Sequence, residues 1–437
     1  MSSGRIEEMA QQAKEAFTEL SAASLAQRNA ALLAIAKQID ARRAKLLEEN
    51  RLDVAGAEAA HLAQPLISRL KLTDAKIDRM IDGLRALATL PDPLGHTQYA
   101  KELADGLKLF RVSCAIGVIG VIFESRPDAL VQISSLCLKS GNAVLLKGGS
   151  EAQRSNQALF EAIVEASREA GLPGGWIGLL QSRQDVAEML RQDEFIDLII
   201  PRGSKAFVRY IMENSNIPVL GHSDGICHVY VDRDADVSMA VKLIVDSKTQ
   251  SLAVCNATET LLVHKDIAER YLPLAAAALA EKGTELRGCE RTRAIIPCKP
   301  ATEEDWATEY LDNILSIRVV DSLDDAIRHV NRYGSKHTDA IVTENFEAAK
   351  RFMSMVDSAG VYQNCTTRFS DGFLYGFGAE VGIATGKLHA RGPMGLEGLC
   401  TYKYKMFGHG QTLADLGEGK YTLTQTDLNE ECPTDKA

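Results

Sequence analysis

Apolar residues near the N-terminus recur every three or four positions, which is the period of an amphipathic helix. They are Ile6, Met9, Ala10, Ala13, Phe17 and Leu20. Polar residues separate them, so we expect a first helix here and not a leader peptide. Ala, Leu, Glu, Lys and Arg predominate up to about residue 90, just before Pro91 and Pro93. The whole N-terminal region is therefore predicted to be helical.

Short apolar runs alternate with amphipathic segments from residue 117 onward. Strands are predicted at 117–123, 143–147, 176–180, 197–200 and 217–220. Helices are predicted between them at 127–139, 150–170, 184–191 and 204–214. Ser150 is the predicted N-cap of the second of these helices. Alternation of this kind predicts a parallel, doubly wound α/β sheet, a layout typical of nucleotide binding.

A second alternating series begins after residues 221–225, where we expect the two α/β units to join. Its predicted strands lie at 226–231, 258–264, 314–320, 340–343 and 360–363. Its predicted helices lie at 236–247, 266–281, 323–332 and 346–356. Residues 364–398 are rich in glycine and turn formers, and so long a segment without regular structure is usually functional. The polar stretch after about residue 412 is expected to be loosely ordered.

Composition limits the class of protein. The chain has 437 residues, of which 46% are hydrophobic and 25% charged, as in a soluble globular protein of two or three domains. Its 49 basic and 59 acidic residues give a net charge of −10, which disfavours nucleic acid as a partner. Apolar runs such as 118–123 are far shorter than the roughly 18 residues that span a bilayer, so no membrane association is expected.

The cysteines indicate free thiols. There are nine of them, at positions 114, 137, 227, 255, 289, 298, 365, 400 and 432. An odd number at wide spacings fits a reducing cytoplasm better than a disulfide framework. No two lie within three residues of each other, so zinc and redox motifs of the C-x-x-C type are absent and no metal site is predicted.

Other familiar motifs are absent or in the wrong context. Neither G-x-G-x-x-G nor the Walker A pattern follows a predicted strand, so any nucleotide must bind in an unusual mode. Residues 221–225 match G-x-S-x-G, but a nucleophilic Ser223 needs a following helix, and an alternating strand pattern follows instead. A turn between two domains is preferred, with a serine hydrolase as the alternative. His222, Cys227 and His228 lack the spacing of a metal site, and the last two point to opposite faces of a strand.

Cys255 is the thiol most typical of a catalytic residue. It lies in a small-residue segment, 251–258, between a predicted helix and a predicted strand. Most single cysteines are inert buried hydrophobes, and we expect that of the other eight. At a cleft between domains, however, a thiolate can attack a carbonyl while its backbone N–H stabilises the oxyanion. A non-catalytic binding protein is the alternative.

Around Cys255 the sequence resembles a known family. Cys255, Asn256 and the run ETLL at 259–262 are similar to the catalytic segment of the γ-glutamyl phosphate reductase family, in the aldehyde dehydrogenase superfamily. The resemblance extends to about residue 411 in ordered blocks. They are ESRPD at 124–128, SGN at 140–142, KGGS at 147–150, IIPRG at 199–203, GHSDG at 221–225, EYLD at 309–312, RYGS at 332–335, HT at 337–338, TRF at 367–369, DGF at 371–373, GAEVGI at 378–383, HARGP at 389–393 and GLEGL at 395–399. The chain departs from the family at Gln250-Ser251-Leu252, where a proline is usual, and at Cys365, where alanine is usual.

The resemblance implies an aldehyde dehydrogenase-like fold, with a parallel doubly wound cofactor domain, an α/β catalytic domain and a small oligomerisation flap. The flap would pair the strand-like segment 102–114 with 400–407, in a homodimer or tetramer. The implied boundaries are 1–101 and 116–221 for the NADP-binding domain, 222–397 for the catalytic domain, 102–115 and 398–411 for the flap, and 412–437 for a polar tail.

The implied activity is the NADPH-dependent reduction of L-glutamyl 5-phosphate to L-glutamate 5-semialdehyde and phosphate, the second step of proline biosynthesis, through a thioacyl group on a cysteine. A phosphorylating or CoA-acylating aldehyde dehydrogenase for a different acyl group is the alternative. No glutamate kinase domain is found before residue 1, so the labile substrate is expected from a separate protein. Association with that glutamate kinase is left open, and the implied location is the cytoplasm.

Two details of the resemblance concern specificity. Water-using relatives carry a general-base Glu in E-L-G-G, whereas the similar segment here, 219–222, reads VLGH. Without that base, water attack on the acyl enzyme is not assisted. The superfamily segment K-P-x-E becomes KGGS at 147–150, with Ser150 in place of the Glu that binds the adenosine ribose. Its loss, with Lys147 retained, favours NADP over NAD.

The resemblance assigns roles to individual residues, any of which could instead be structural. Cys255 and Asn256 would be catalytic. Glu309 would bind the nicotinamide ribose, and the helix start at Gly203 and Ser204 would suit a pyrophosphate. The implied cofactor-binding residues are Ser125, Arg126, Pro127, Lys147, Gly149, Ser150, Gly203, Ser204 and Glu309. A dianionic acyl phosphate needs clustered cations, so the substrate-binding candidates are His222, Arg368, His389 and Arg391.

Overall fold

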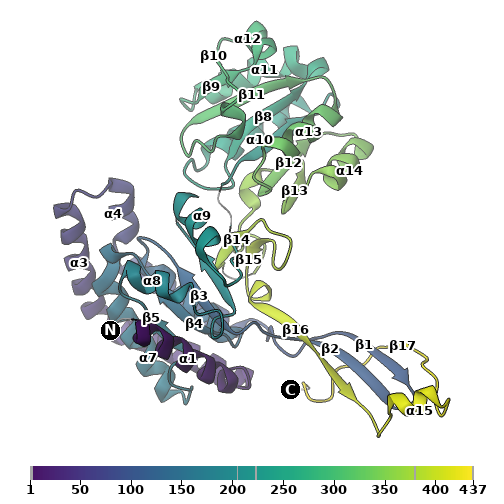
Figure 1. The fold of residues 1–437 in the computed structure, drawn as a ribbon. Coiled ribbons are helices and arrows are strands. Elements are labelled where there is room, and N and C mark those ends of the chain that lie inside the picture. The colour runs from purple at the N-terminus through teal and green to yellow at the C-terminus, as the bar shows by residue number, and fades with distance from the viewer. Residues whose placement is uncertain (1–2, 204, 222–223, 378–379, 436–437) are drawn as a thin grey trace.

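A computed structural model describes residues 3–203, 205–221, 224–377 and 380–435. The chain forms two α/β lobes and an extended antiparallel flap, which projects away from both lobes (Figure 1). None of the helices in these described ranges is long and apolar enough to cross a membrane.

The N-terminal region is helical, as predicted. Its helices are α1 (Ser3–Leu20), α2 (Leu25–Ala41), α3 (Arg43–Ala59), α4 (Gln64–Leu70) and α5 (Asp74–Thr89). Ser24 and Thr73 cap α2 and α5, because each side chain accepts a hydrogen bond from the backbone N–H three residues later. Apolar residues of α1 pack on the first lobe's sheet, whereas those of α2 and α5 pack on the helices that cover it.

The first lobe contains a four-stranded sheet in which all pairings are parallel. Its strand order is β5 (Ile177–Leu179), β4 (Ala143–Lys147), β3 (Val118–Ile122) and β6 (Leu198–Pro201). The connecting helices are α6 (Pro127–Lys139), α7 (Gln153–Glu169), α8 (Arg183–Met189) and α9 (Lys205–Asn214). The chain runs outward from β3 through β4 to β5 and then returns to β6 on the other side of β3. Ligands of doubly wound sheets bind at the carboxyl ends of strands at such a reversal.

Two local predictions for this lobe are wrong. Residues 217–220 are not a strand, because Val219 makes only an isolated bridge with Ile199. Pro218 has no N–H to extend the pairing. Ser150 does not cap α7, because it opens a 3-10 turn, η1 (Ser150–Ala152), and α7 follows with Ala152 at its N-cap position.

The second lobe contains a seven-stranded sheet, again with parallel pairings throughout. Its order is β10 (Lys299–Pro300), β9 (Glu285–Gly288), β11 (Ile314–Val320), β8 (Thr258–His264), β7 (Cys227–Val231), β12 (Thr338–Val342) and β13 (Gly360–Gln363). The helices are α10 (Val237–Thr249), α11 (Lys265–Ala280), α12 (Glu290–Ile295), α13 (Leu323–Tyr333) and α14 (Phe346–Met355), with a 3-10 turn η2 (Asp305–Ala307). The sequence missed β9, α12 and β10, which are short and polar.

Residues 364–399 contain little regular structure, as expected. They form two 3-10 turns, η3 (Thr367–Phe369) and η4 (Glu397–Leu399), and a small antiparallel pair, β14 (Gly382–Ala384) with β15 (Gly392–Met394). Several of their apolar side chains lie in the core of the first lobe. The segment therefore returns the chain from the second lobe to the first.

The flap has the strand order β16 (Cys400–Phe407), β2 (Leu107–Ala115), β1 (Thr97–Ala104) and β17 (Thr426–Leu428). The predicted pairing of the two flap segments is confirmed, because β16 lies antiparallel to β2 over its whole length. The expected loose order of the tail is wrong. After a short helix α15 (Leu413–Gly417), β17 pairs with β1, and Cys432 is fully buried. β17 is a polar strand of three residues, and its partner β1 lies more than 300 residues earlier in the chain. The local sequence therefore gives no sign of this pairing.

Acid should destabilise the second lobe through His329 of α13. Its ring is buried against Trp306 and Tyr333, and its Nδ1 accepts from Arg318 Nη1 at 3.2 Å. Burial lowers the pKa of His329 to about 2, and His228 and Arg318 add to the shift. The pKa of His329 is lower in the folded protein than in the unfolded chain, so the neutral ring stabilises the fold. This stabilisation is complete above about pH 6.5 and is lost as the pH falls. Between pH 7 and 5 the loss approaches about 2 kcal/mol.

The measurement is urea denaturation at several pH values between 5 and 7.5. His329→Gln keeps an acceptor for Arg318 but cannot titrate, so its unfolding free energy should fall less steeply toward pH 5. An equal slope in the two proteins would contradict this account.

Candidate active site

The predicted site residues lie on two facing sheet edges. In the first lobe, the loops after β3, β4 and β6 lie at the carboxyl edge of the parallel sheet. In the second lobe, Cys255 precedes β8, Glu309 precedes β11 and Gly225 precedes β7. Strands of a parallel sheet begin at one edge, so these three segments are gathered at the amino edge of that sheet.

The backbone of Cys255 is held from behind by β7. Gly225 lies so close that a Cβ atom there would be 2.2 Å from the carbonyl oxygen of Cys255, so no other residue fits without movement. Cys227 Sγ donates to the same oxygen at 3.2 Å. The side chain of Cys255 is half-buried. Close packing thus fixes the backbone of the residue that carries the thiol.

Asn256 ties the Cys255 loop to η3. Its Nδ2 donates to the carbonyl oxygens of Ser370 at 2.9 Å and Arg368 at 3.3 Å, and its own carbonyl accepts from Thr367 Oγ1 at 2.7 Å. Its side-chain N–H groups therefore hold the loop in place. The catalytic role predicted for Asn256 stays a prediction, and the geometry favours a positioning role.

The thiol of Cys255 is protonated at neutral pH. Burial raises its pKa to about 12, and the carboxylates of Glu380 and Glu309 add to the shift. The backbone N–H of Cys255 and the guanidinium of Arg202 act in the opposite direction. Anything that moves a carboxylate away from the sulfur, or a cation toward it, would increase the thiolate fraction.

Two guanidinium groups lie near the thiol. The predicted substrate residue Arg368 donates from Nε to Gln250 Oε1 at 2.9 Å. Arg202 follows β6, and its Nη2 lies 4.0 Å from Oε1 of Glu380. Burial lowers the pKa of each arginine, and the charge of Cys255 counteracts this in both. Arg202 comes from the first lobe, so the two lobes meet at this sulfur. Sequence reasoning had noted the IIPRG block but gave Arg202 no role.

The loop after β3 is built around Glu151. Ser125 has a left-handed backbone with φ +46°, and its N–H and hydroxyl both donate to Glu151 Oε1, at 2.7 and 2.5 Å. Arg126 is the N-cap residue of α6 and Pro127 its first residue. The three predicted cofactor residues thus form one rigid turn at the carboxyl end of β3. Glu151 was not predicted, because its contact is with a residue 26 positions earlier.

The two glycines after β4 are closely packed by neighbouring side chains. A Cβ atom at Gly149 would lie 2.0 Å from Glu151 Oε1, and one at Gly148 would lie 2.1 Å from Asn156 Nδ2. Lys147 is buried and its Nζ donates to the carbonyl of Gly148. Burial lowers the pKa of Lys147, and Glu151 counteracts this. The predicted replacement of an acid by Ser150 does not leave the region without an acid, because the carboxylate of the next residue, Glu151, acts on Lys147.

The remaining predicted cofactor residues are partly accounted for. Gly203 lies between β6 and α9, and a Cβ there would be 3.1 Å from Phe207 and 3.2 Å from Glu124. Glu309 is half-buried and close enough to Cys255 to affect its pKa. Ser204 and the predicted substrate residue His222 lie outside the described residues. No cluster of His, Cys, Asp and Glu that could hold a metal occurs within the described ranges.

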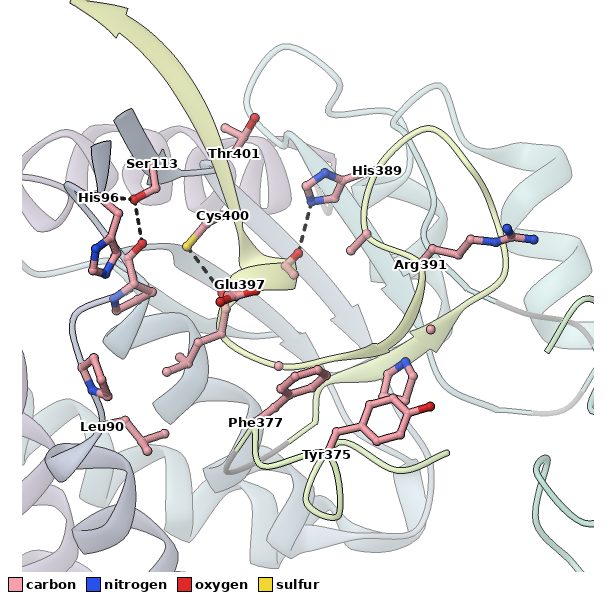
Figure 2. Close-up of a pocket in the computed structure, with 18 of the residues that line it drawn as sticks. Leu90, His96, Ser113, Tyr375, Phe377, His389, Arg391, Glu397, Cys400 and Thr401 are labelled. Carbon is pink, nitrogen blue, oxygen red and sulfur yellow. Dashed lines mark hydrogen bonds between the residues drawn. The ribbon is translucent and has the colours of Figure 1, made fainter. Parts of the chain in front are cut away.

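His389 and Arg391 are not brought to the sulfur. They line a cavity of about 790 Å³ at the root of the flap, together with residues near Asp92 and Ser113, and neither Cys255 nor Asn256 borders it. His389 Nε2 lies 3.1 Å from the carbonyl of Gly398, while Arg391 points away from it and pairs with Asp357 (Figure 2). Their predicted part in substrate binding stays a prediction.

Comparisons with known proteins agree with this geometry. A family model described as "Aldehyde dehydrogenase family" matches residues 1–287. A γ-glutamyl phosphate reductase of Acetivibrio thermocellus is 56% identical over 98% of this chain and 99% of its own. One from Pelotomaculum thermopropionicum is 57% identical over 97% of this chain and 98% of its own. The crystal structure of the Thermotoga maritima γ-glutamyl phosphate reductase superposes with a TM-score of 0.92, at 44% identity over 93% of this chain and 99% of that one.

Two parallel sheets that meet at a half-buried cysteine, with a flap, define an aldehyde dehydrogenase-like protein, and the family model and the superposition confirm this class. Within that class, the chain belongs to the γ-glutamyl phosphate reductase family. The predicted fold class and family resemblance are therefore confirmed.

The charges around the sulfur predict opposite effects of two substitutions on its reactivity. Glu380→Gln removes a carboxylate that disfavours the thiolate, so alkylation of Cys255 by iodoacetamide at pH 8 should accelerate by about fivefold. Arg202→Gln removes a cation that favours the thiolate, so the same rate should fall by a similar factor. The measurement is the alkylation rate of Cys255, followed by peptide mass spectrometry between pH 7 and 10. Changes of the same sign in both variants would contradict this electrostatic account.

Proposed function

We propose that this protein catalyses the NADPH-dependent reduction of L-glutamyl 5-phosphate to L-glutamate 5-semialdehyde and phosphate, in proline biosynthesis. The observation that carries the proposal is the half-buried Cys255 where the lobes meet, with Arg202 and Arg368 near its sulfur, in a chain 56% identical to a γ-glutamyl phosphate reductase. A thiol is the nucleophile for acyl transfer, and guanidinium groups recognise phosphate.

The reaction begins at the sulfur. Cys255 loses its proton, and the thiolate attacks the acyl carbon of the substrate. The carbon–oxygen bond to phosphate breaks, phosphate leaves, and the glutamyl group remains on the enzyme as a thioester. The backbone N–H of Cys255 would stabilise the oxyanion, and Arg202 and Arg368 would stabilise the departing phosphate. NADPH held at the first-lobe edge would supply a hydride for reduction of the acyl group to the aldehyde level, and release of the aldehyde would leave Cys255 free again.

The residues on the first-lobe edge fit a dinucleotide. The loops after β3, β4 and β6 lie at the carboxyl edge of the parallel sheet, where doubly wound folds bind their ligands. Gly148, Gly149 and Gly203 let these loops pack closely against neighbouring side chains. In our proposal the turn at Ser125–Pro127 and these loops hold the coenzyme, and Lys147 favours its 2′-phosphate. Glu309 would hold the nicotinamide ribose. Aldehyde dehydrogenases use nicotinamide cofactors, which supports this class of ligand.

The proposed domains follow the implied boundaries except at residues 97–101, which belong to β1 of the flap. Residues 1–96 and 116–221 would bind the coenzyme, 222–397 would carry the nucleophile, and 97–115 with 398–411 form the flap. Residues 412–435 are added to the flap through β17. The nine cysteines are free thiols, which supports a cytoplasmic location. A glutamate kinase is the proposed source of the labile acyl phosphate.

The activity is tested in the reverse direction, by following NADP reduction with glutamate 5-semialdehyde. The rate should depend on added phosphate, because phosphate must attack the thioester, and it should exceed the rates with other aldehydes. Cys255→Ala should lower the rate by at least about a thousandfold. The matched control is Cys365→Ala, which should retain nearly full activity. A rate indifferent to phosphate would indicate a water-using dehydrogenase, and a preference for another aldehyde would indicate a different acyl phosphate.

We further propose that the flap joins copies of this chain. The strand β16 is the edge of its sheet, so its outer backbone groups are free for pairing. Tyr404 and Met406 lie on one face of it and are 56% and 57% exposed. An unpaired edge with exposed large apolar side chains is typical of a protein–protein interface.

Charge on that face should therefore lower the molecular mass in solution. Tyr404→Lys/Met406→Lys should give a smaller species than the wild-type homo-oligomer, as measured by light scattering after size exclusion. Lys403→Gln, on the opposite face of β16, is the matched control and should leave the mass unchanged. A doubly substituted protein that keeps the wild-type mass would show that this face is not the interface.

A further inference from the structure

A fully buried ion pair lies directly behind the nucleophile loop. Lys248, in the last turn of α10, and Glu259, in β8, flank the loop that carries Cys255. Lys248 Nζ donates to Glu259 Oε2 at 2.6 Å, and neither side chain is exposed to solvent. The mechanism above does not use either residue.

Stability alone does not explain this pair. Moving two charges out of water costs several kcal/mol per ion, and apolar replacements of such pairs are often neutral or stabilising. The role of such a pair is therefore inferred from the other contacts that its atoms make. Here the second oxygen of Glu259 accepts a hydrogen bond from the backbone N–H of Leu311, at 3.4 Å. That contact joins β8 to the loop that carries Glu309.

The backbone at Leu311 needs such support. Its φ is +53°, in the left-handed region, which is unfavourable for a non-glycine residue. The Leu311 side chain is 48% exposed, so burial of apolar surface does little to hold this conformation. The bond to Glu259 fixes the backbone instead.

The neighbouring residue holds the loop at a second point. Tyr310 donates its hydroxyl to Asp305 Oδ1 at 2.6 Å, and its ring lies 6.0 Å from Lys248 Nζ. Residues 310 and 311 are thus both anchored, and Lys248 lies over the Tyr310 ring and bonds to Glu259, the acceptor for Leu311. The residue immediately before them is Glu309, whose carboxylate is near the sulfur of Cys255.

We propose that Lys248 and Glu259 are positioning residues, which fix the loop 309–311 so that Glu309 faces the nicotinamide ribose beside Cys255. The inference rests on the proposed function for the identity of the coenzyme. Glu259 acts as the acceptor for Leu311, and Lys248 orients that carboxylate through the hydrogen bond to its other oxygen. Neither side chain touches substrate or coenzyme.

The test compares two double variants that both remove the buried charges. In Lys248→Met/Glu259→Gln the amide oxygen still accepts from Leu311, whereas in Lys248→Met/Glu259→Leu no acceptor remains. We expect the dissociation constant of NADPH, measured by quenching of tryptophan fluorescence, to rise about tenfold in the Leu variant. It should stay within about threefold of wild type in the Gln variant. The KM for NADPH should follow the dissociation constant, with a smaller change in kcat.

A matched control separates positioning from general destabilisation. Asp339, in β12, is an equally buried carboxylate, which accepts from His228 at 2.8 Å and does not contact the loop 309–311. Asp339→Asn should lower the melting temperature but leave NADPH binding unchanged. Melting temperatures of all variants establish that each is folded under the assay conditions.

Three outcomes would overturn the inference. Wild-type NADPH affinity in the Leu variant would show that the loop needs no acceptor. Equal weakening in the Gln and Leu variants would show that the charge, and not the acceptor, matters. Failure of the wild-type protein to bind NADPH would overturn the proposed function itself and, with it, this inference.

Discussion

The close approach of two backbone segments, at Gly225 and Cys255, determines the geometry of the site. Because a Cβ at Gly225 would overlap the carbonyl group of Cys255, β7 and the nucleophile loop can pack only with glycine there. The sulfhydryl of Cys227 adds a hydrogen bond to the same carbonyl oxygen. The backbone that carries the thiol is thus fixed, and Arg202 of the first lobe is close enough to affect the pKa of that thiol. The nucleophile therefore takes its position from rigid strands, and its own loop can consist of small residues.

The site is arranged so that the thiol is a weak acid until charges rearrange. Two carboxylates near Cys255, from Glu380 and Glu309, oppose ionisation, and burial opposes it further. Two guanidinium groups, from Arg202 and Arg368, favour an anion in the same place. Such a balance protects a cysteine from oxidation and from stray electrophiles, because the thiolate is the reactive form. It also suits a phosphorylated substrate, which the same cations recognise.

Local patterns in the sequence predicted local structure well. The bounds of α6 and β4 match the predicted segments, because each has an unbroken apolar pattern that ends in turn formers. Cys255 stood out for a similar reason, as a thiol in a small-residue loop between two regular elements. Two failures were local, at the Pro218 segment and at the 3-10 turn of Ser150, and others depend on distant contacts. The pairing of β17 with β1 and the contact of Glu151 with Ser125 join residues that no local pattern relates. Likewise, only the three-dimensional structure shows that Glu259 pairs with the buried Lys248.

The acidity of Cys255 depends on how the lobes are joined. Glu380 precedes a segment whose apolar residues, including Val381 and Met394, lie in the core of the first lobe, and Arg202 leaves that lobe's sheet directly. Glu380 and Arg202, which act on the thiol from outside the second lobe, are thus both fixed to the first lobe. The segment that carries Glu380 continues into β16, which pairs with β2 over its whole length, and β2 leads into β3. The hydrogen bonds between β16 and β2 therefore fix the returning chain to the first lobe. A displacement of one lobe relative to the other would change the distances from the sulfur to Glu380 and Arg202, and so the pKa of the thiol. It would not alter any contact inside the nucleophile loop.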